Sequence, residues 1–378
     1  MDRRKFLGLG VGAAISGGTA ALWRSSAGRE SEDGSGVPPA FSVIPVVGDG
    51  KWIWTAPPQG QTGYLEPRSY LLNVGIEIVG QGSSSQIKAT TPVPIPCPEQ
   101  RIDEERIESR GCEAQIREIA PDARQLYLAA PEIGPGQTIS AVAHCKLTIS
   151  KQFHNYQRDQ FPEEQKIPND VRRTYLGDSP GIQSRSKEVR QLLEKLTGDT
   201  THPWELARKF ASWIPRNIRP QIGPFTGVSA ALENRLGDCA EMSAVFVALS
   251  RAAGIPARLV WVPDHNWSEF YLTDKQGQGH WIPAHTACYF WFGWTGVHEL
   301  VLQKGDRLRL PERGGKLYRL QEDWMQWLGR RPTVRYLAEL TPQPARPGED
   351  PGPGARRKIA SGEWKLTGSH PLDRYARR

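Results

Sequence analysis

Residues 237–285 read GDCAEMSAVFVALSRAAGIPARLVWVPDHNWSEFYLTDKQGQGHWIPAH. In the first part of this stretch the apolar residues recur at helical spacing, at Met242, Val245, Phe246 and Leu249. The helical pattern ends at Gly254. Beyond it the period of the apolar residues changes to two, over 259–262, 267–272 and 280–285. We therefore predict one helix that begins at Cys239 and is followed by strands.

Cys239 lies at the start of the predicted helix. The N–H groups and the macrodipole at a helix N-terminus favour an anion, so we expect a stabilised thiolate and a lowered thiol pKa. The neighbouring N–H groups can also hold the oxyanion of a tetrahedral intermediate. A nucleophile needs a base within hydrogen-bond reach, and His265 at the start of a later strand can supply it.

A second histidine, His285, is predicted to lie beside His265. The segment 274–279 (DKQGQG) is rich in turn-forming residues, which predicts a hairpin. If the hairpin is centred near residue 275, His265 and His285 are opposite neighbours, about 5 Å apart at Cα. The residue that orients the base of a catalytic triad normally occupies this position. A slip of one residue would move one of the side chains to the other face.

Four motifs in this region, taken in order, resemble the transglutaminase-like superfamily. They are GDCAE at 237–241, AGIPAR at 253–258, H-x-W-x-E-x-Y at 265–271 and WIPAH at 281–285. The resemblance covers roughly residues 160–300; the ordered set is specific, whereas each motif alone is weak. It implies an α+β, papain-like core whose triad is a helix-borne Cys, a strand-borne His and an Asp on the next strand. By this resemblance Cys239 is the nucleophile and His265 the base.

The chain departs from the family pattern at His285, which replaces the usual Asp. A neutral imidazole can orient His265 through one hydrogen bond, but it cannot stabilise an imidazolium as a carboxylate does. Loss of the anionic partner costs serine proteases about 10⁴ in rate, whereas a preformed thiolate–imidazolium pair depends on it less. Two hypotheses remain: an active site of Cys239, His265 and His285, or a non-catalytic copy of the fold that acts as a binding module.

The enzyme hypothesis predicts attack of Cys239 on a peptide or glutamine-type amide to form a thioester. Water would resolve the thioester in a peptidase or amidase, and an amine would resolve it in a cross-linking acyltransferase. We expect a protein or peptide as the partner, with a cell-wall polymer as the alternative. We expect no cofactor and no metal, because His280, His285 and Cys288 fit no standard zinc spacing.

Three features have two explanations each. Cys239 is either the nucleophile or a buried structural thiol, and its Gly-Asp-Cys helix start favours the first. The aromatic run 289–294 (YFWFGW) either lines a groove for sugar rings or packs on the sheet, and packing is favoured. Cys97 and Cys112 enclose a short loop and are the favoured disulfide pair, although sequence does not fix the pairing.

The rest of the chain suggests a second domain and a tail. Residues 42–157 show several period-two runs broken by Gly, Pro and Ser, which predict an antiparallel β-sandwich. Helical spacing begins near Ser186, so we assign 158–342 to the transglutaminase-like domain with a C-terminal extension. Residues 343–378 are rich in Pro, Gly and Arg without periodicity, and we expect them to be disordered.

The N-terminus resembles a bacterial twin-arginine export signal. Arg3 and Arg4 precede a weakly hydrophobic, Gly- and Ala-rich run and a small-residue patch, which together form a signal segment over 1–27 before a polar linker at 28–41. We expect an exported protein in the periplasm or at the cell surface. The alternatives are an uncleaved membrane anchor and a short amphipathic N-terminus.

The formal charge of +7 does not indicate a nucleic-acid-binding protein. Residues 1–30 hold five basic and two acidic residues, and 343–378 hold eight basic and four acidic ones. The two ends therefore account for the whole excess, and the body between them is neutral. A nucleic-acid-binding domain needs a basic patch on its folded part, so we expect no nucleic-acid partner.

Overall fold

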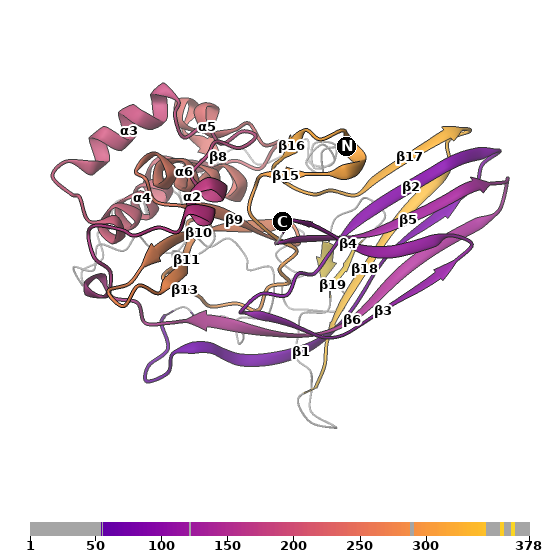
Figure 1. Ribbon diagram of the computed structural model, residues 1–378, viewed down its shortest axis with the longest axis horizontal. Helices are drawn as coiled ribbons and strands as arrows, with labels where there is room; N and C mark the ends of the chain where they lie inside the picture. The colour runs from indigo at the N-terminus through magenta and orange to yellow at the C-terminus, as the bar shows by residue number, and fades with distance from the viewer. Residues whose placement is uncertain are drawn as a thin grey trace, which may run out of the picture. The chain divides into compact units, whose positions relative to one another are not determined.

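The computed structural model describes residue 54, residues 56–120, 122–287 and 291–344, and the backbone of two short strands at 356–358 and 364–366. Contacts within the chain divide these residues into two units (Figure 1). The helical unit comprises 154–259 and 265–295, and the strand unit comprises 54–153, 260–264 and the residues from 296 onward. The expected signal segment and linker lie outside the described residues.

The strand unit is built from antiparallel strands, most of them long. They are β1 (Gly63–Val79), β2 (Ser84–Val93), β3 (Gln100–Arg110), β4 (Glu113–Ala120), β5 (Ala123–Ile133), β6 (Thr138–Phe153), β14 (Gln303–Lys304), β15 (Leu308–Arg309), β16 (Leu317–Tyr318), β17 (Trp324–Gly329) and β18 (Thr333–Pro342). One sheet contains the order β6-β1-β18, with β3 beside β6. The other contains β14-β5-β2-β17, with β4 beside β5.

The two sheets share one hydrophobic core. In β1 the alternate residues Leu72, Val74, Ile76 and Ile78 are buried, and they cluster with residues of β2, β5, β6 and β18. Successive side chains of a strand point to opposite faces, so a strand with one buried face must alternate in this way. The predicted antiparallel β-sandwich and the α+β fold class are both confirmed.

The strand unit also contains residues that we had assigned elsewhere. β18 pairs with β1, and β17 pairs with β2, although both follow the helical unit in the sequence. Our sequence analysis placed them in an extension of the transglutaminase-like domain. Within the tail expected to be disordered, β19 (Arg356–Lys358) pairs with β18, and β20 (Trp364–Leu366) pairs with β19. Local periodicity cannot report such pairings, because the partner strands are far apart in sequence.

The helical unit packs helices against strands. Its elements are η1 (Arg158–Gln160), α2 (Asn169–Tyr175), α3 (Lys187–Thr197), α4 (Pro203–Asn217), β7 (Arg219–Pro220), α5 (Val228–Asn234), β8 (Leu236–Gly237), α6 (Cys239–Ala252), β9 (Ala257–Val262), β10 (His265–Thr273), β11 (Gly279–His285), β12 (Trp291–Phe292) and β13 (Trp294–Thr295). The ends of the helices follow from capping. The Ser186 side chain accepts the N–H of Val189 at the start of α3, and Pro203 occupies the first turn of α4. None of the described helices is both long and apolar enough to cross a membrane.

Helix α6 is the centre of this unit. Every residue from Ala240 to Arg251 is buried, and the helix contacts α3, α4, α5 and β10 (Figure 1). Phe246 of α6 meets Phe270 of β10 with ring centroids 5.9 Å apart. A helix buried on all sides needs apolar residues all round, which the sequence from Met242 to Leu249 provides. The first residue of this central helix is Cys239.

The favoured disulfide does not form in this structure. Cys97 and Cys112 are both thiols, and the Cys112 thiol donates a hydrogen bond to the carbonyl of Ser140 (3.2 Å). Burial raises the pKa of Cys112, and it raises the pKa of Cys145 to about 12. Since the thiolate is the nucleophile, these two cysteines are poorly reactive at neutral pH.

Candidate functional site

A double cap fixes the start of α6. The carboxylate of Asp238 accepts the N–H of Ala240 (2.8 Å), and the carboxylate of Glu241 accepts the N–H of Asp238 (3.1 Å). A side chain at Gly237 would bring its Cβ to 2.4 Å from Cβ of Glu241, so only glycine fits there. The cap therefore holds Cys239 at the first position of the helix. Cys239 is half-buried.

The cap changes one expectation about the helix N-terminus. The sequence suggested that the N–H groups beside Cys239 hold an oxyanion. In the structure the Asp238 side chain accepts hydrogen bonds from the N–H groups of Ala240 and Glu241. Those two donors are therefore engaged by the cap, and an oxyanion needs other donors. The Asp238 carboxylate also adds a negative charge near the sulfur, which opposes the effect of the helix dipole on the thiol.

Glu241 links the cap to the preceding loop. One oxygen of its buried carboxylate accepts the N–H of Asp238, and the other accepts the N–H of Thr226 (2.8 Å). Burial raises the pKa of Glu241, and the nearby Asp238 raises it further. The loop before α5 is therefore tied to the first turn of α6.

Hydrogen bonds hold the start of β10 against the start of α6. The Asn266 amide donates to the carbonyl oxygen of Cys239 (3.3 Å), and the Ser243 hydroxyl donates to the carbonyl of Asn266 (3.4 Å). Farther along, the Ser268 hydroxyl donates to the carbonyl of Ser243 (3.1 Å). Since Asn266 directly follows His265, these bonds bring the backbone of His265 close to that of Cys239. Our sequence analysis missed Asn266. Its place next to His265 on a strand was the available signal, because successive residues of a strand point to opposite faces.

The structure also brings the two histidines together. Nε2 of His265 lies 3.1 Å from Nε2 of His285, and the two residues are 7% and 2% exposed. At this distance one nitrogen carries a proton and the other accepts it, because neutral imidazole has one donor and one acceptor. This hydrogen bond is therefore shielded from water.

The predicted register of the hairpin was wrong by two residues. The pairs run from Ser268↔Ala284 to Thr273↔Gly279, so the turn centres on Gln276, and continuing the register puts His285 opposite Trp267. A shift of two residues keeps a side chain on the same face, whereas a shift of one would not. The two imidazoles therefore still meet, diagonally.

Two tryptophans enclose His285. Its ring stacks on Trp267 (centroids 5.6 Å apart, planes at 22°) and lies edge-on to Trp291 (5.1 Å, 68°). Trp291 in turn contacts Trp294 at 5.3 Å, and both are buried. The described part of the aromatic run therefore packs on the sheet. Residues 289 and 290 of that run lie outside the described residues.

Glu269, an anion on the same strand as His265, is engaged elsewhere. Its carboxylate lies 2.8 Å from both Nε and Nη2 of Arg258, and both side chains are buried. The Arg258 guanidinium also lies 4.0 Å above the Trp281 ring. Removing one partner of such a buried pair would leave an uncompensated charge, so each side chain requires the other.

Two of the residues considered as zinc ligands, His280 and His285, do not come together. Nε2 of His280 lies 2.7 Å from Oδ2 of Asp274 at the turn end of β11, whereas His285 is at its other end. Among the described residues no group of three or more His, Cys, Asp or Glu is placed to hold a metal. Cys288 lies outside those residues.

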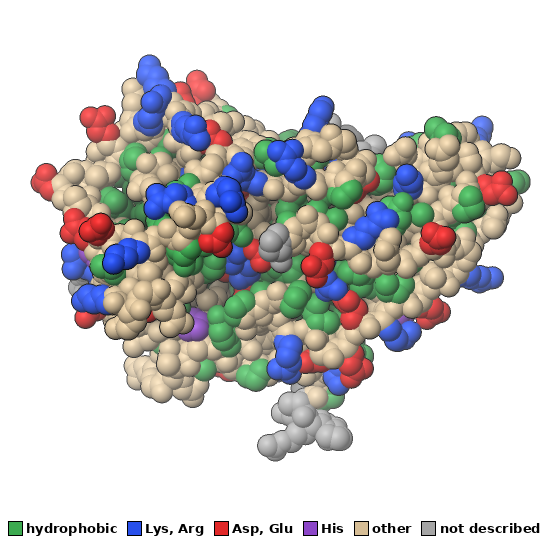
Figure 2. All heavy atoms as spheres, in the orientation of Figure 1, with side chains coloured by type: hydrophobic (Ala, Val, Ile, Leu, Met, Phe, Trp, Pro, Cys, Tyr) green, Lys and Arg blue, Asp and Glu red, His purple; other side chains and the backbone are tan. Residues whose placement is uncertain are grey.

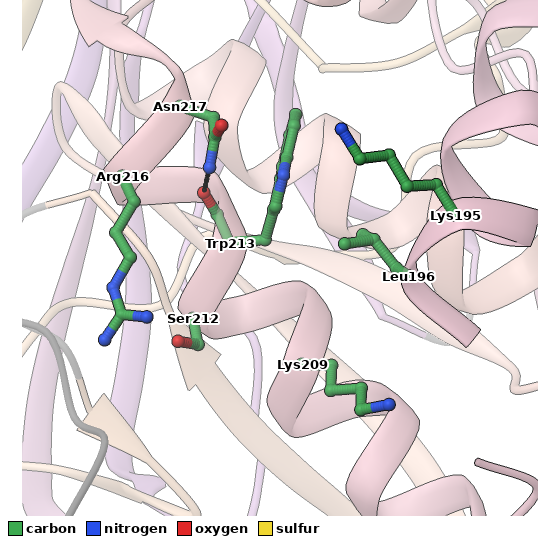
Figure 3. A pocket seen from close by; sticks show the side chains of 7 residues that line it. All are labelled: Lys195, Leu196, Lys209, Ser212, Trp213, Arg216 and Asn217. Atoms are coloured by element: carbon green, nitrogen blue, oxygen red, sulfur yellow. Dashed lines mark hydrogen bonds between the residues drawn. The ribbon is translucent and has the colours of Figure 1, made fainter. Parts of the chain in front are cut away.

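A surface hollow of about 450 Å³ lies elsewhere in the helical unit (Figure 3). It is lined by residues of α3 and α4: Lys195, Leu196, Lys209, Ser212, Trp213, Arg216 and Asn217. None of the three candidate site residues is among them. On the face shown in Figure 2, basic and acidic side chains are mixed, without an extended basic surface.

Comparison with known proteins identifies the domain that carries these residues. Residues 190–286 match the model of the transglutaminase-like superfamily. The chain contains a transglutaminase-like domain. At the level of this family, the match supports a cysteine-dependent enzyme. The matched range includes all three candidate site residues: Cys239, His265 and His285.

Two solved structures are similar to this chain. One, from Cytophaga hutchinsonii, is described as a "Putative Cysteine Protease"; it is 15% identical with a TM-score of 0.47, over 74% of this chain and 99% of that one. The other, from Parabacteroides distasonis, is described as a "Putative Protease"; it is 13% identical with a TM-score of 0.24, over 56% of this chain and 42% of that one. No curated protein matches the chain.

Proposed function

We propose that the transglutaminase-like domain is a cysteine enzyme that forms a thioester at Cys239 from a peptide or glutamine-type amide. The observation that carries the proposal is the junction of α6 and β10. Asn266 binds the carbonyl of Cys239, and the adjacent His265 is held by His285. A half-buried thiol, a base and an orienting group are thus supplied by α6, β10 and β11.

In this proposal each nitrogen of His265 has a separate task. Nε2 faces His285, so Nδ1 is the nitrogen that acts on the thiol. In the proposed reaction Nδ1 takes the proton of Cys239, and the sulfur attacks the amide carbon. The C–N bond then breaks, and the leaving amine takes the proton from His265. Water or a second amine gives a proton to His265, attacks the thioester and releases the thiolate.

A non-catalytic binding module is the second candidate. The observation that favours it is the partner of His265, which is an imidazole and not a carboxylate. His285 cannot stabilise an imidazolium at His265 by opposite charge. In a binding module the thiol pKa of Cys239 would be near the ordinary value of about 8.5.

Alkylation by iodoacetamide separates the two candidates. In the enzyme, Cys239 reacts at pH 6 at least about tenfold faster than the matched thiol Cys112, whose pKa is raised by burial. His265→Ala should remove this advantage, because the base is lost. A rate at Cys239 that His265→Ala leaves unchanged would rule out the enzyme, because a thiol of ordinary pKa reacts faster than Cys112 even without a base.

We further propose export through the N-terminal twin-arginine motif, with a protein or peptide as the substrate and a cell-wall polymer as the alternative. The support is Arg3 and Arg4 before a Gly- and Ala-rich segment. Replacing both arginines by lysine should leave the precursor in the cytoplasm, as cell fractionation would show. Unchanged export of that variant would contradict the proposal.

A further inference from the structure

The segment from 221 to 226 runs beside the start of α6. β7 and β8 pair in parallel, with Arg219 opposite Leu236 and Pro220 opposite Gly237. The N–H of Gln221 continues this pairing to the carbonyl of Gly237 (3.0 Å). This pairing holds Gln221 against the segment that leads into α6, and residue 222 is the next residue along the chain.

Residue 222 is an isoleucine that points into solvent. Ile222 is 74% exposed, more than any other large hydrophobic residue in the described part of the chain. A single exposed apolar side chain is common on proteins. Ile222 directly follows Gln221, which is hydrogen-bonded to Gly237, two residues before Cys239, and this position is the reason to consider it further.

The segment that carries Ile222 is held at both ends. Gln221 is bonded to Gly237 at one end, and the N–H of Thr226 is bonded to the Glu241 carboxylate at the other. Near the second end Phe225 packs over Gly181, where an added Cβ would lie 2.3 Å from the ring. The isoleucine therefore sits on an anchored loop, and a bound group would meet it without first ordering the loop.

We propose that Ile222 is a specificity-determining residue that contacts an apolar side chain of the acyl donor bound at Cys239. This inference rests on the proposed function and deepens it by naming the substrate class: peptides with an aliphatic side chain next to the reacting carbonyl. Contact with such a side chain removes apolar surface of both partners from water. A charged side chain in that position gains no such contact.

Three affinity labels test the proposal: the chloromethyl ketones of N-acetylglycine, N-acetylleucine and N-acetylaspartate. Each alkylates a reactive thiol, with the sulfur displacing chloride, and each differs only in the side chain. The rate at Cys239 is measured by mass spectrometry of the full-length protein. In the wild type we expect the leucine label to react about tenfold faster than the glycine label, and the aspartate label to be the slowest.

Substitution of Ile222 then tests whether this residue causes the preference for the leucine label. Ile222→Asp should bring the leucine-to-glycine ratio close to one, and Ile222→Val should keep most of it. The matched control is Leu328→Asp on β17, which replaces another exposed aliphatic side chain and should leave the ratio unchanged. The leucine-to-glycine ratio of labelling rates is measured within one preparation of each variant. Partial unfolding lowers both rates together, so it does not imitate a loss of the preference.

The possible failures are distinguishable. If His265→Ala does not change the rate at which the glycine label reacts with Cys239, the proposed function fails. If labelling of Cys239 is fast and depends on His265 but the wild type shows no preference for leucine, the role of Ile222 is overturned while the proposed function stands. A preference for leucine that remains in Ile222→Asp would also overturn the role of Ile222.

Discussion

At the scale of the residue, the unusual feature is an imidazole in place of a carboxylate. His265 and His285 share a short Nε2–Nε2 contact in a site closed by Trp267 and Trp291. The pair can pass a proton along one hydrogen bond, but it carries no negative charge. Orientation of the base therefore depends on ring packing.

His285 gives the most direct mutational test. His285→Ala should slow alkylation of Cys239 at pH 6 by about 100-fold, because His265 loses its orienting bond. His285→Asp should retain or raise the wild-type rate, because a carboxylate stabilises the imidazolium and with it the thiolate. Rates that are the same in all three proteins would contradict a role for His285 in the site.

Asp238 should influence the thiol through its charge. Asn is as good an N-cap as Asp, so Asp238→Asn keeps the helix start and removes one negative charge beside Cys239. An anion near a thiol raises the thiol pKa, so its removal should lower the apparent pKa of Cys239 by roughly half a unit to one unit. The pH dependence of alkylation measures this shift, and a shift upward would refute the electrostatic argument.

At the scale of the element, the β10–β11 hairpin places one histidine beside the other. Its turn depends on Asp274, whose carboxylate accepts the N–H groups of Gln276 (2.9 Å) and Gln278 (2.8 Å) and contacts His280. The hydrogen bond to His280 is the main cause of the lowered pKa of Asp274. The turn is therefore held by an ionised carboxylate.

The lowered pKa predicts how the hairpin responds to acid. A depressed carboxyl pKa means that the charged form stabilises the folded state; this stability is present above the ordinary pKa of about 3.9 and is lost as pH falls through the lower folded value. Asp274→Ala should cost about 1–2 kcal/mol at pH 7, measured by urea unfolding. The difference from wild type should shrink toward pH 3, and a constant difference would show that Asp274 acts only as a packing residue.

At the scale of the whole molecule, the sandwich is closed by a strand made late in the chain. Leu340 of β18 pairs with Leu72 of β1 and is 3% exposed in the core. Leu340→Ala should cost about 2–5 kcal/mol of unfolding free energy. Leu71→Ala is the matched control, because Leu71 lies on β1 but is 43% exposed; it should cost no more than about 0.5 kcal/mol. Equal losses in the two variants would mean that β18 does not complete the core.

The sequence predicted what depends on near neighbours. Helix α6 was predicted from apolar spacing and its glycine end, and β1 from simple alternation. The meeting of His265 and His285 was predicted on the correct face but in the wrong register, since turn length decides register and DKQGQG allows more than one centre. The partners of β17 and β18 could not be predicted, because strand pairing between distant segments leaves no local pattern. Asn266 and Ile222 were missed because what distinguishes them is their position in the fold beside the start of α6, which no local sequence pattern reports.

The late position of β18 has a consequence for biosynthesis. A ribosome releases the chain from its N-terminus, so β1 emerges long before the strand that covers its edge. Until residues 333–342 appear, that edge presents unpaired N–H and C=O groups, which invite pairing with other chains. The sandwich can therefore close only after translation has passed the whole helical unit. Export of a chain that is already folded, as the twin-arginine proposal requires, would keep this edge covered before the protein leaves the cytoplasm.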